Sequence, residues 1–193
     1  EVGADVSRVD VGDRVALSWI KASGIEAGGT SYGWNGRTVN AGAVTSFQRH
    51  SVVSENRLTK LPPELKMREA TLLGCALPTG LGAVINVAKP QPGESVAIFG
   101  AGGVGLCAVM GAVVSKCSPV IAIDLIDSKL EIAVMFGATH TINGRKGNGI
   151  EEVMEICPMG VDLAIEATGR PAVMATALTA VRAQGGRAVV IGN

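Results

Sequence analysis

The sequence has few aromatic residues and no excess of either charge. Aromatic residues make up 3% of the 193 residues, and 17 Lys and Arg are balanced by 17 Asp and Glu. Proteins that bind nucleic acid or a charged membrane surface usually carry a basic stripe, so we expect neither partner. The longest apolar run, residues 104–114, is much shorter than the roughly 20 residues that cross a bilayer. These absences leave a small molecule as the expected ligand.

Cysteine is also sparse. The four cysteines, Cys75, Cys107, Cys117 and Cys157, lie far apart and include no CxxC pair. Small disulfide-bonded domains carry cysteine more densely, and this pattern is typical of a reducing compartment. No secretory signal is visible at the beginning of the sequence. We therefore expect a cytoplasmic protein.

What the sequence does contain is typical of an α/β protein. Hydrophobic residues make up 47% of the chain and glycine contributes 26 residues. From about residue 92, apolar β-like runs alternate with helical patterns, which predicts parallel strands joined by helical crossovers. The expected strands are residues 95–99, 120–124, 139–142, 162–166 and 187–191, and the expected helices are 103–116, 128–136, 150–157 and 171–182. The result is a doubly wound parallel Rossmann sheet with five of its usual six strands, and we expect the sixth to belong to a longer protein.

The first part of the chain has a different texture. It is rich in turns, with short β-like runs at residues 14–19, 51–54 and 58–61 and a glycine-rich loop expected over residues 23–40. We predict a partial β-rich domain over residues 1–78 and a truncated dinucleotide-binding domain over residues 79–193.

A glycine-rich turn is the main functional motif. Gly100, Gly102 and Gly105 form a GxGxxG pattern between a predicted strand and a predicted helix. In this setting the first glycine permits the tight turn, the second lets a pyrophosphate approach the backbone, and the third lets helix and strand pack closely. Gly103 and Val104 would add N–H groups at the helix N-terminus. The alternative is an ordinary glycine-rich turn, but the strand–helix context favours a dinucleotide site.

Asp124 ends the second predicted strand, about 20 residues beyond the glycine turn, where a carboxylate can accept hydrogen bonds from the adenosine ribose. Its negative charge would repel a 2′-phosphate, so NAD is favoured over NADP. The alternative is a strand-end Asp that starts a turn or caps the next helix. Lys129 is a further candidate contact to the same ribose, although a solvated lysine on a helix face is nearly as plausible.

Two other residues are weaker candidates. Cys75 has no second metal ligand nearby in the sequence, and by itself it is more typical of a small buried residue than of a metal ligand. Glu166 ends the fourth predicted strand and could touch the edge of the cofactor, although a structural role is the more common one.

The order of several sequence blocks carries a family resemblance. Val-Gly-Asp-Arg-Val at 11–15, the run 47–53, Gly-Cys-Ala-Leu-Pro-Thr-Gly at 74–80 and the glycine turn resemble the zinc-dependent alcohol dehydrogenases of the medium-chain dehydrogenase/reductase superfamily. The resemblance covers nearly the whole chain. It implies a GroES-like catalytic domain before the Rossmann domain and a homodimer or homotetramer when the protein is full length.

The resemblance also implies roles for individual residues. Cys75 becomes a ligand of the catalytic zinc, and Thr79 lies near the nicotinamide. Ile191 and Gly192 would meet the nicotinamide ring or its carboxamide. Thr168 and Gly169 would border the adenosine side of the cofactor.

The expected activity is the NAD-dependent, zinc-assisted oxidation of an alcohol to an aldehyde or ketone. The family's other catalytic-zinc ligands, a cysteine and a histidine, precede the 11–15 block and are absent from this sequence, so we expect the chain alone to be inactive. Because residues 18–40 contain no cysteine, we expect no structural zinc. The alternatives are a zinc-free quinone or enoyl reductase of the same superfamily and a nucleotide-binding module without catalysis.

Overall fold

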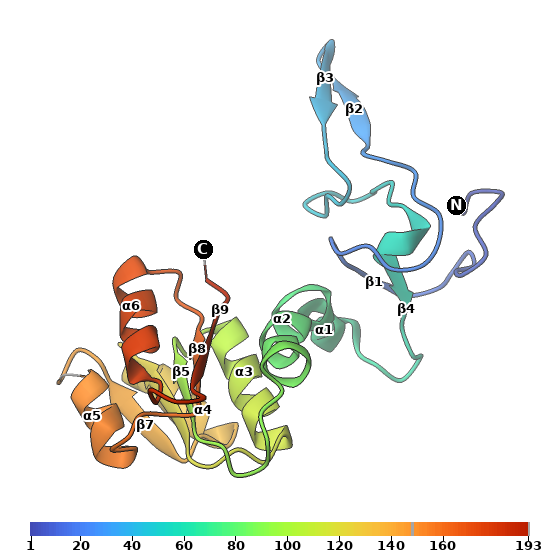
Figure 1. Cartoon of the computed structure of the whole chain (residues 1–193). Helices are drawn as coiled ribbons and strands as arrows, with labels where there is room; N and C mark the ends of the chain where they lie inside the picture. The colour runs from blue at the N-terminus through green and yellow to red at the C-terminus, as the bar shows by residue number, and fades with distance from the viewer. Residues whose placement is uncertain (148, 193) are drawn as a thin grey trace. The chain divides into compact units, whose positions relative to one another are not determined.

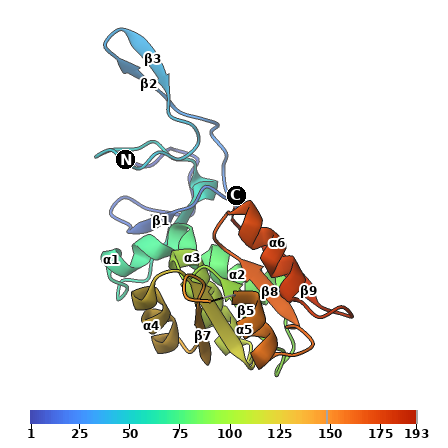
Figure 2. The same cartoon turned by 90° about the vertical axis from the view of Figure 1, so that its left-hand side faces the viewer.

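The computed structural model describes residues 1–147 and 149–192 (Figure 1, and turned by 90° in Figure 2). The chain divides into two compact units, which we call unit 1 (Glu1–Cys75) and unit 2 (Ala76–Asn193). No single helix within the described ranges is both long and apolar enough to cross a bilayer, and Met67–Gly74 with Ala76–Ala88 satisfies length and composition only as a bent pair.

Unit 2 is built on one parallel sheet with the strand order β7-β6-β5-β8-β9. Successive strands run outward from β5 in both directions, which is the order of a doubly wound dinucleotide-binding sheet. The α/β fold class expected from the sequence is therefore confirmed. The strands are β5 (Val96–Phe99), β6 (Val120–Asp124), β7 (His140–Asn143), β8 (Leu163–Glu166) and β9 (Arg187–Val190).

Helices cover both faces of this sheet. They are α3 (Gly103–Val114), α4 (Asp127–Met135), α5 (Gly149–Ile156) and α6 (Pro171–Ala180). Consecutive residues of a strand point to opposite faces. Ile98 accordingly packs with Val109 of α3 in one core cluster, whereas Phe99 packs with Val153 of α5 and Ala177 of α6 in the other. The helix expected to begin at Ser128 begins instead at Asp127, with Ile126 at its N-cap.

A further helix that the sequence did not predict packs against α3. It consists of α2 (Ala76–Gly82) and a π-helical continuation, η3 (Ala83–Ala88). A Cβ atom added to Gly80 would lie 2.1 Å from the carbonyl oxygen of Val104 on α3, so only glycine permits this approach. Gly111 makes a similar close approach to Val84. Packing between the two helices stabilises a segment whose proline and glycines have poor intrinsic helix propensity.

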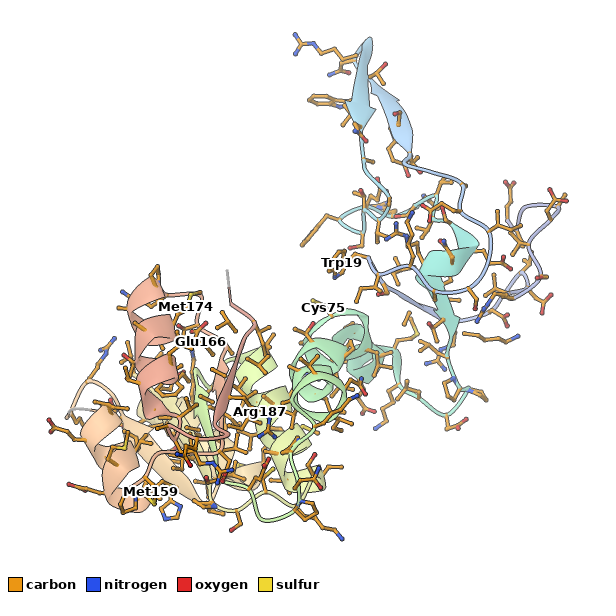
Figure 3. All side chains as sticks on the ribbon, viewed as in Figure 1. Trp19, Cys75, Met159, Glu166, Met174 and Arg187 are labelled. Atoms are coloured by element: carbon orange, nitrogen blue, oxygen red, sulfur yellow. The ribbon has the colours of Figure 1, made fainter. Side chains whose placement is uncertain are left out.

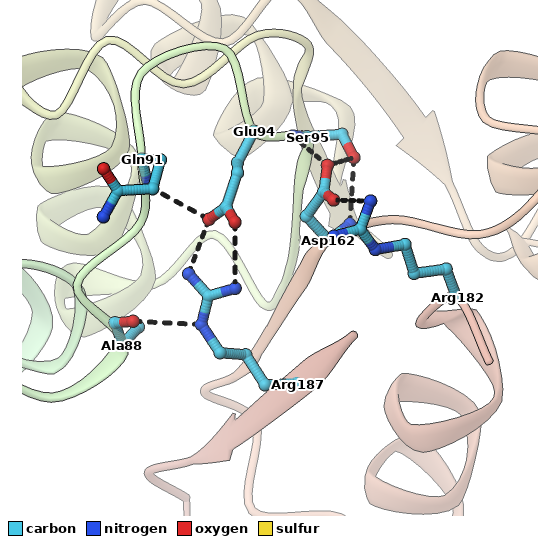
Figure 4. Close-up of polar contacts among 7 residues, drawn as sticks. All are labelled: Ala88, Gln91, Glu94, Ser95, Asp162, Arg182 and Arg187. Atoms are coloured by element: carbon cyan, nitrogen blue, oxygen red, sulfur yellow. Dashed lines mark hydrogen bonds and ion pairs between the residues drawn. The ribbon is translucent and has the colours of Figure 1, made fainter. Parts of the chain in front are cut away.

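Polar side chains fix the end of the sheet at which β5 and β9 begin (Figure 4). Arg187 forms an ion pair with Glu94 at 2.5 Å and donates through Nε to the carbonyl of Ala88 at 3.0 Å. Beside this pair, the Asp162 carboxylate accepts hydrogen bonds from the Ser95 N–H at 2.8 Å and hydroxyl at 2.6 Å. These contacts join the starts of β5, β8 and β9, at the end of the sheet opposite the glycine turn.

Unit 1 contains two small antiparallel sheets. Strand β1 (Val15–Leu17) pairs with β4 (Leu58–Lys60), and β2 (Ser31–Trp34) pairs with β3 (Arg37–Asn40). The remaining elements are the 3-10 helix η1 (Glu55–Arg57), the short helix α1 (Met67–Ala70) and the 3-10 helix η2 (Thr71–Gly74).

Two expectations for unit 1 are wrong. The stretch 23–40 is not a loop throughout, because it contains the β2–β3 hairpin, whose turn at Asn35 and Gly36 has positive φ at both residues. Residues 51–54 form no strand, and Ser54 is the N-cap of η1. Here the chain is organised by polar contacts rather than by a ladder.

The main polar contact is made by Glu55, whose side chain is buried although it is acidic. Its carboxylate accepts backbone hydrogen bonds from Ser7 at 2.8 Å, Arg8 at 2.7 Å and Ile25 at 2.8 Å. The bonds from Ile25 and Ser7 lower the pKa of Glu55, and burial opposes them. A single side chain thus ties three segments of unit 1 together.

Candidate functional site

The glycine turn joins β5 to α3 in unit 2. Gly100 has φ +96°, a conformation that side chains rarely adopt. A Cβ atom on Gly105 would lie 1.7 Å from the carbonyl oxygen of Gly100, so helix and strand approach too closely for any other residue. Gly102 is the N-cap of α3, and an added Cβ there would meet no atom within 4 Å. The turn thus presents open space at the helix N-terminus, where Gly103 and Val104 begin the helix and backbone N–H groups can bind an anion.

Asp124 lies at the end of β6 and is hydrogen-bonded to the glycine turn. Its Oδ2 accepts the N–H of Ala101 at 2.7 Å, and its Oδ1 accepts the N–H groups of Leu125 at 2.7 Å and Ile126 at 3.1 Å. Lys129 Nζ lies 3.9 Å from Oδ2. A carboxylate has about four acceptor positions, so three backbone donors hold this one in place and leave limited capacity for a ligand hydroxyl.

A cavity of about 480 Å³ opens beside Asp124 at the carboxyl ends of the strands. Ligands of doubly wound sheets bind in this region. Its lining residues come from the ends of β5 and β6, the start of α4, the loops after β7 and β8 and the first turn of α6: Phe99, Gly100, Ile123, Asp124, Leu125, Ile126, Lys129, Arg145, Thr168, Arg170, Ala172 and Val173. Gly100, Asp124, Lys129 and Thr168, all singled out in the sequence, therefore line one cavity.

Arg145 and Arg170 also line this cavity, and the sequence reasoning missed both. Neither guanidinium forms an ion pair with another described residue. With Lys129 they give this cavity three cationic side chains, which suits a ligand that carries phosphate. Each arginine follows a strand at the carboxyl edge of the sheet, and this position was the signal that could have identified them.

The turn after β8 is held by Glu166. The Glu166 side chain is fully buried, and its Oε1 accepts both the N–H of Thr168, at 2.7 Å, and the Thr168 hydroxyl. Its Oε2 accepts the N–H of Gly169 at 3.3 Å. Glu166, at the end of β8, is labelled in Figure 3.

The end of β9 lies against the same turn. Ile191 N–H donates to the backbone carbonyl of Glu166 at 2.8 Å, and a Cβ atom on Gly192 would lie 2.1 Å from the nitrogen of Gly169. The predicted cofactor contacts on Thr168, Gly169, Ile191 and Gly192 thus belong to one connected region, which Glu166 holds together.

The two residues predicted for catalysis lie on either side of the division between the units. Cys75 is exposed and follows η2 at the end of unit 1, and Thr79 lies in α2 of unit 2 (Cys75 is labelled in Figure 3). Among the described residues, no three His, Cys, Asp or Glu side chains come together as a metal site. A catalytic zinc takes three protein ligands, so these residues by themselves do not fit one.

Comparisons with known proteins show which family the chain resembles. The family profile described as zinc-binding dehydrogenase matches residues 103–193. The chain is 40% identical over 182 residues to an S-(hydroxymethyl)glutathione dehydrogenase of Synechocystis sp., covering 92% of this chain and 49% of that protein. It is 40% identical over 150 residues to alcohol dehydrogenase 1 of Pisum sativum, covering 77% of this chain and 40% of that protein. The chain therefore spans about half the length of the curated relatives it matches or less.

Solved structures show the same likeness. The crystal structure of benzyl alcohol dehydrogenase from Acinetobacter calcoaceticus matches with a TM-score of 0.82 at 28% identity, over 100% of this chain and 58% of that one. An alcohol dehydrogenase from a Thermus species matches with a TM-score of 0.67 at 40% identity, over 73% of this chain and 41% of that one.

Proposed function

The chain belongs to the zinc-binding dehydrogenases, and we propose that it binds NAD in unit 2 and serves an enzyme that oxidises an alcohol to an aldehyde or ketone. The observation that carries the proposal is the cavity beside Asp124, which adjoins the glycine turn and lies at the carboxyl edge of the sheet. Bound NAD supplies the hydride acceptor of such a reaction.

The described residues fit the cofactor. Gly102 leaves open space at the N-cap of α3, where backbone N–H groups and the positive end of the helix dipole favour a pyrophosphate. Asp124, held by Ala101, Leu125 and Ile126, is oriented before any ligand arrives. Its contribution is to fix the ribose and to disfavour a 2′-phosphate.

Cationic side chains limit how strongly the cavity can favour NAD over NADP. Lys129, Arg145 and Arg170 would each attract a 2′-phosphate as well as the pyrophosphate. Among the described residues that line the cavity, Asp124 is the only acidic one, so we expect the preference for NAD over NADP to depend on it.

At the other end of the site, Ile191 and Gly192 would meet the nicotinamide, and their contacts with Glu166 and Gly169, beside the cofactor crevice, support this assignment. Thr79 would face the reacting end of the cofactor, and Cys75 would contribute one ligand to a zinc completed by residues outside this sequence. The described residues do not by themselves form the site of that metal.

Cellular context belongs to the same proposal. We place the protein in the cytoplasm, in keeping with its well-separated cysteines, two of which, Cys107 and Cys117, are buried in unit 2. Burial raises the pKa of both thiols, which makes them poor nucleophiles. We also propose a homodimer or homotetramer for the full-length protein, acting on a small alcohol or carbonyl compound.

Calorimetric titration of the chain with NAD and NADP tests the proposal. We expect NAD to bind about tenfold more tightly than NADP, a difference of 1.4 kcal/mol. Asp124→Asn should weaken NAD binding about tenfold and reduce the preference for NAD over NADP. Asp127→Asn is the matched control, because Asp127 lies three residues on, outside the cavity lining, and contacts Lys146 at 2.7 Å.

Wild-type protein that binds neither nucleotide would overturn the cofactor assignment. The alcohol chemistry is tested on the full-length protein, by NADH formation from alcohols together with its zinc content. A zinc-free protein that reduces quinones or enoyl compounds with NADPH would identify the reductase alternative. NAD binding without any turnover would identify a nucleotide-binding module.

A further inference from the structure

A buried carboxylate lies at the centre of the predicted cofactor crevice without touching the cavity itself. Glu166 is fully buried, ends β8 and is absent from the residues that line the cavity beside Asp124. An ionised carboxyl group in a protein interior is costly unless hydrogen bonds compensate for lost solvation. Here the compensation comes from Thr168 and Gly169, so the bonds that stabilise Glu166 also fix the turn that follows it.

That turn touches both halves of the crevice. On one side, a Cβ atom on Gly100 would lie 2.8 Å from Thr168 Cγ2, so the turn abuts the glycine turn. On the other side, a Cβ atom on Gly192 would lie 2.1 Å from the Gly169 nitrogen and 2.9 Å from Glu166 Oε2. Gly169 itself has φ +72°, a conformation that its hydrogen bond to Glu166 helps to hold.

From this geometry we infer that Glu166 is a positioning residue, which holds the Thr168–Gly169 turn against the end of β9 and so shapes the part of the crevice that receives the nicotinamide half of the cofactor. The inference rests on the proposed function, because it concerns the same NAD site. It assigns Glu166 no contact with substrate or cofactor. The adenosine half depends chiefly on Asp124 and its own backbone donors, and the turn reaches that half only through Thr168, which lines the same cavity.

Replacing the carboxylate by an amide removes hydrogen-bond acceptors from this turn while the side chain keeps nearly the same size. In Glu166→Gln one oxygen becomes an NH2 group, which faces an N–H or O–H donor and cannot accept from it. A buried donor then loses its partner, which is typically worth about tenfold in an equilibrium constant. The turn would relax away from Gly192, while the glycine turn and Asp124 remain in place.

The experiment compares two ligands on the full chain by calorimetry. NAD spans the whole crevice, whereas AMP occupies only the adenosine half. We expect Glu166→Gln to weaken NAD binding about tenfold and AMP binding by no more than about threefold, because Thr168 lines the cavity beside Asp124 whereas Ile191 and Gly192 do not. A purely structural role would weaken both ligands together.

The matched control is Asp162→Asn, at the other end of β8. Asp162 also accepts a backbone and a hydroxyl hydrogen bond, both from Ser95, but it lies at the edge of the sheet away from the crevice. This variant should lower the thermal midpoint and leave the ratio of NAD to AMP affinity unchanged. Thr168→Ala removes the hydroxyl donor from the opposite partner and gives a second test if Glu166→Gln does not fold. Because Thr168 also lines the cavity beside Asp124, this variant is judged by the ratio of NAD to AMP affinity, which should fall.

The possible results distinguish failure of the inference about Glu166 from failure of the proposed NAD site. Equal loss of NAD and AMP in both Glu166→Gln and Thr168→Ala would overturn the inference, and so would unchanged affinity for both ligands. Wild-type protein that binds AMP but gains nothing from the nicotinamide half would contradict it while leaving the adenosine site intact. Failure of the wild type to bind either ligand would instead refute the proposed function itself.

Discussion

Units 1 and 2 each bury a glutamate that binds backbone N–H groups, but they use it on very different frameworks. Glu55 gathers Ser7, Arg8 and Ile25, which belong to loops far apart in the sequence. Glu166 binds Thr168 and Gly169, which follow it directly along the chain. In unit 1 the carboxylate of Glu55 holds together loops that no sheet or helix connects. In unit 2 the carboxylate of Glu166 fixes the turn after a strand whose position the sheet already determines.

The difference extends to the cores. Unit 2 buries alternate residues of a parallel sheet against helices on both faces. Unit 1 has only two-stranded sheets and leaves large apolar side chains such as Trp19, Trp34 and Phe47 exposed. Because a two-stranded ribbon is marginal by itself, polar contacts contribute a larger share of the order in unit 1. The two regions should therefore respond to different kinds of substitution.

The largest expected effect is in unit 2. Gly105→Ala places a Cβ atom 1.7 Å from the Gly100 carbonyl oxygen, so helix α3 must move off strand β5. We expect a loss of about 1–3 kcal/mol in unfolding free energy, with loss of NAD binding. Chemical denaturation followed by circular dichroism measures the first and calorimetry the second.

Gly102→Ala is the matched control, because its Cβ meets no atom within 4 Å. It should lower the unfolding free energy by less than about 1 kcal/mol. It should still weaken NAD binding, since we expect the added methyl group to point toward the phosphate position. Both tryptophans, Trp19 and Trp34, lie in unit 1, so tryptophan fluorescence should not follow the unfolding caused by Gly105→Ala. A coincident fluorescence transition would show that the units unfold together, and would contradict the expectation that they respond to different substitutions.

An intermediate effect is expected from Glu55→Gln in unit 1. The amide cannot accept all the backbone hydrogen bonds that the carboxylate accepts, so the segments at Ser7 and Ile25 should loosen. We expect a lower thermal midpoint in tryptophan fluorescence and about tenfold faster amide exchange at Ile25. The affinity of unit 2 for NAD should not change.

The exposed Glu64 of unit 1 provides the control, as Glu64→Gln should alter neither measurement. If Glu55→Gln weakened NAD binding as strongly as it loosened unit 1, the carboxylate would not be a local organiser.

The same contrast explains what could be predicted from the sequence. In unit 2, alternation of apolar strands and helices specifies the sheet, and the glycine spacing specifies the turn, because backbone sterics leave few alternatives at Gly100 and Gly105. Asp124 was found because its distance from the turn is set by the length of one βαβ unit. Arg145 and Arg170 were missed because loops after different strands converge only in three dimensions.

Prediction failed where long-range contacts determine the local structure. The α2 helix contains proline and glycine, and its packing on α3 through Gly80 overrides their weak helix propensity. In unit 1, residues 51–54 resemble a strand, but the contacts of Glu55 place the segment beside loops instead. The β2–β3 hairpin did have a local signal, Asn35-Gly36, which was overlooked within a glycine-rich stretch.

The smallest expected effect concerns the pH dependence of unit 2. The hydrogen bond from Arg187 lowers the pKa of Glu94 below its usual 4.5, and burial opposes this shift. A carboxyl group whose pKa is lower in the folded state stabilises the protein above its unfolded pKa, and this contribution is lost as pH falls through the folded value. We therefore expect wild-type unit 2 to lose on the order of 1 kcal/mol from this pair between about pH 5 and pH 3.

Glu94→Gln should remove that part of the acid sensitivity, while Glu131→Gln on the exposed surface of α4 should leave it intact. Denaturation followed by circular dichroism at pH 7, 5 and 3 measures both. Because Glu94 and Arg187 join β5 to β9 at the edge away from the crevice, NAD affinity at neutral pH should be the same in Glu94→Gln as in wild type. A large loss of NAD affinity would mean that the two edges of the sheet are coupled. The idea that one end of the strands contributes stability and the other end binds the ligand would then be wrong.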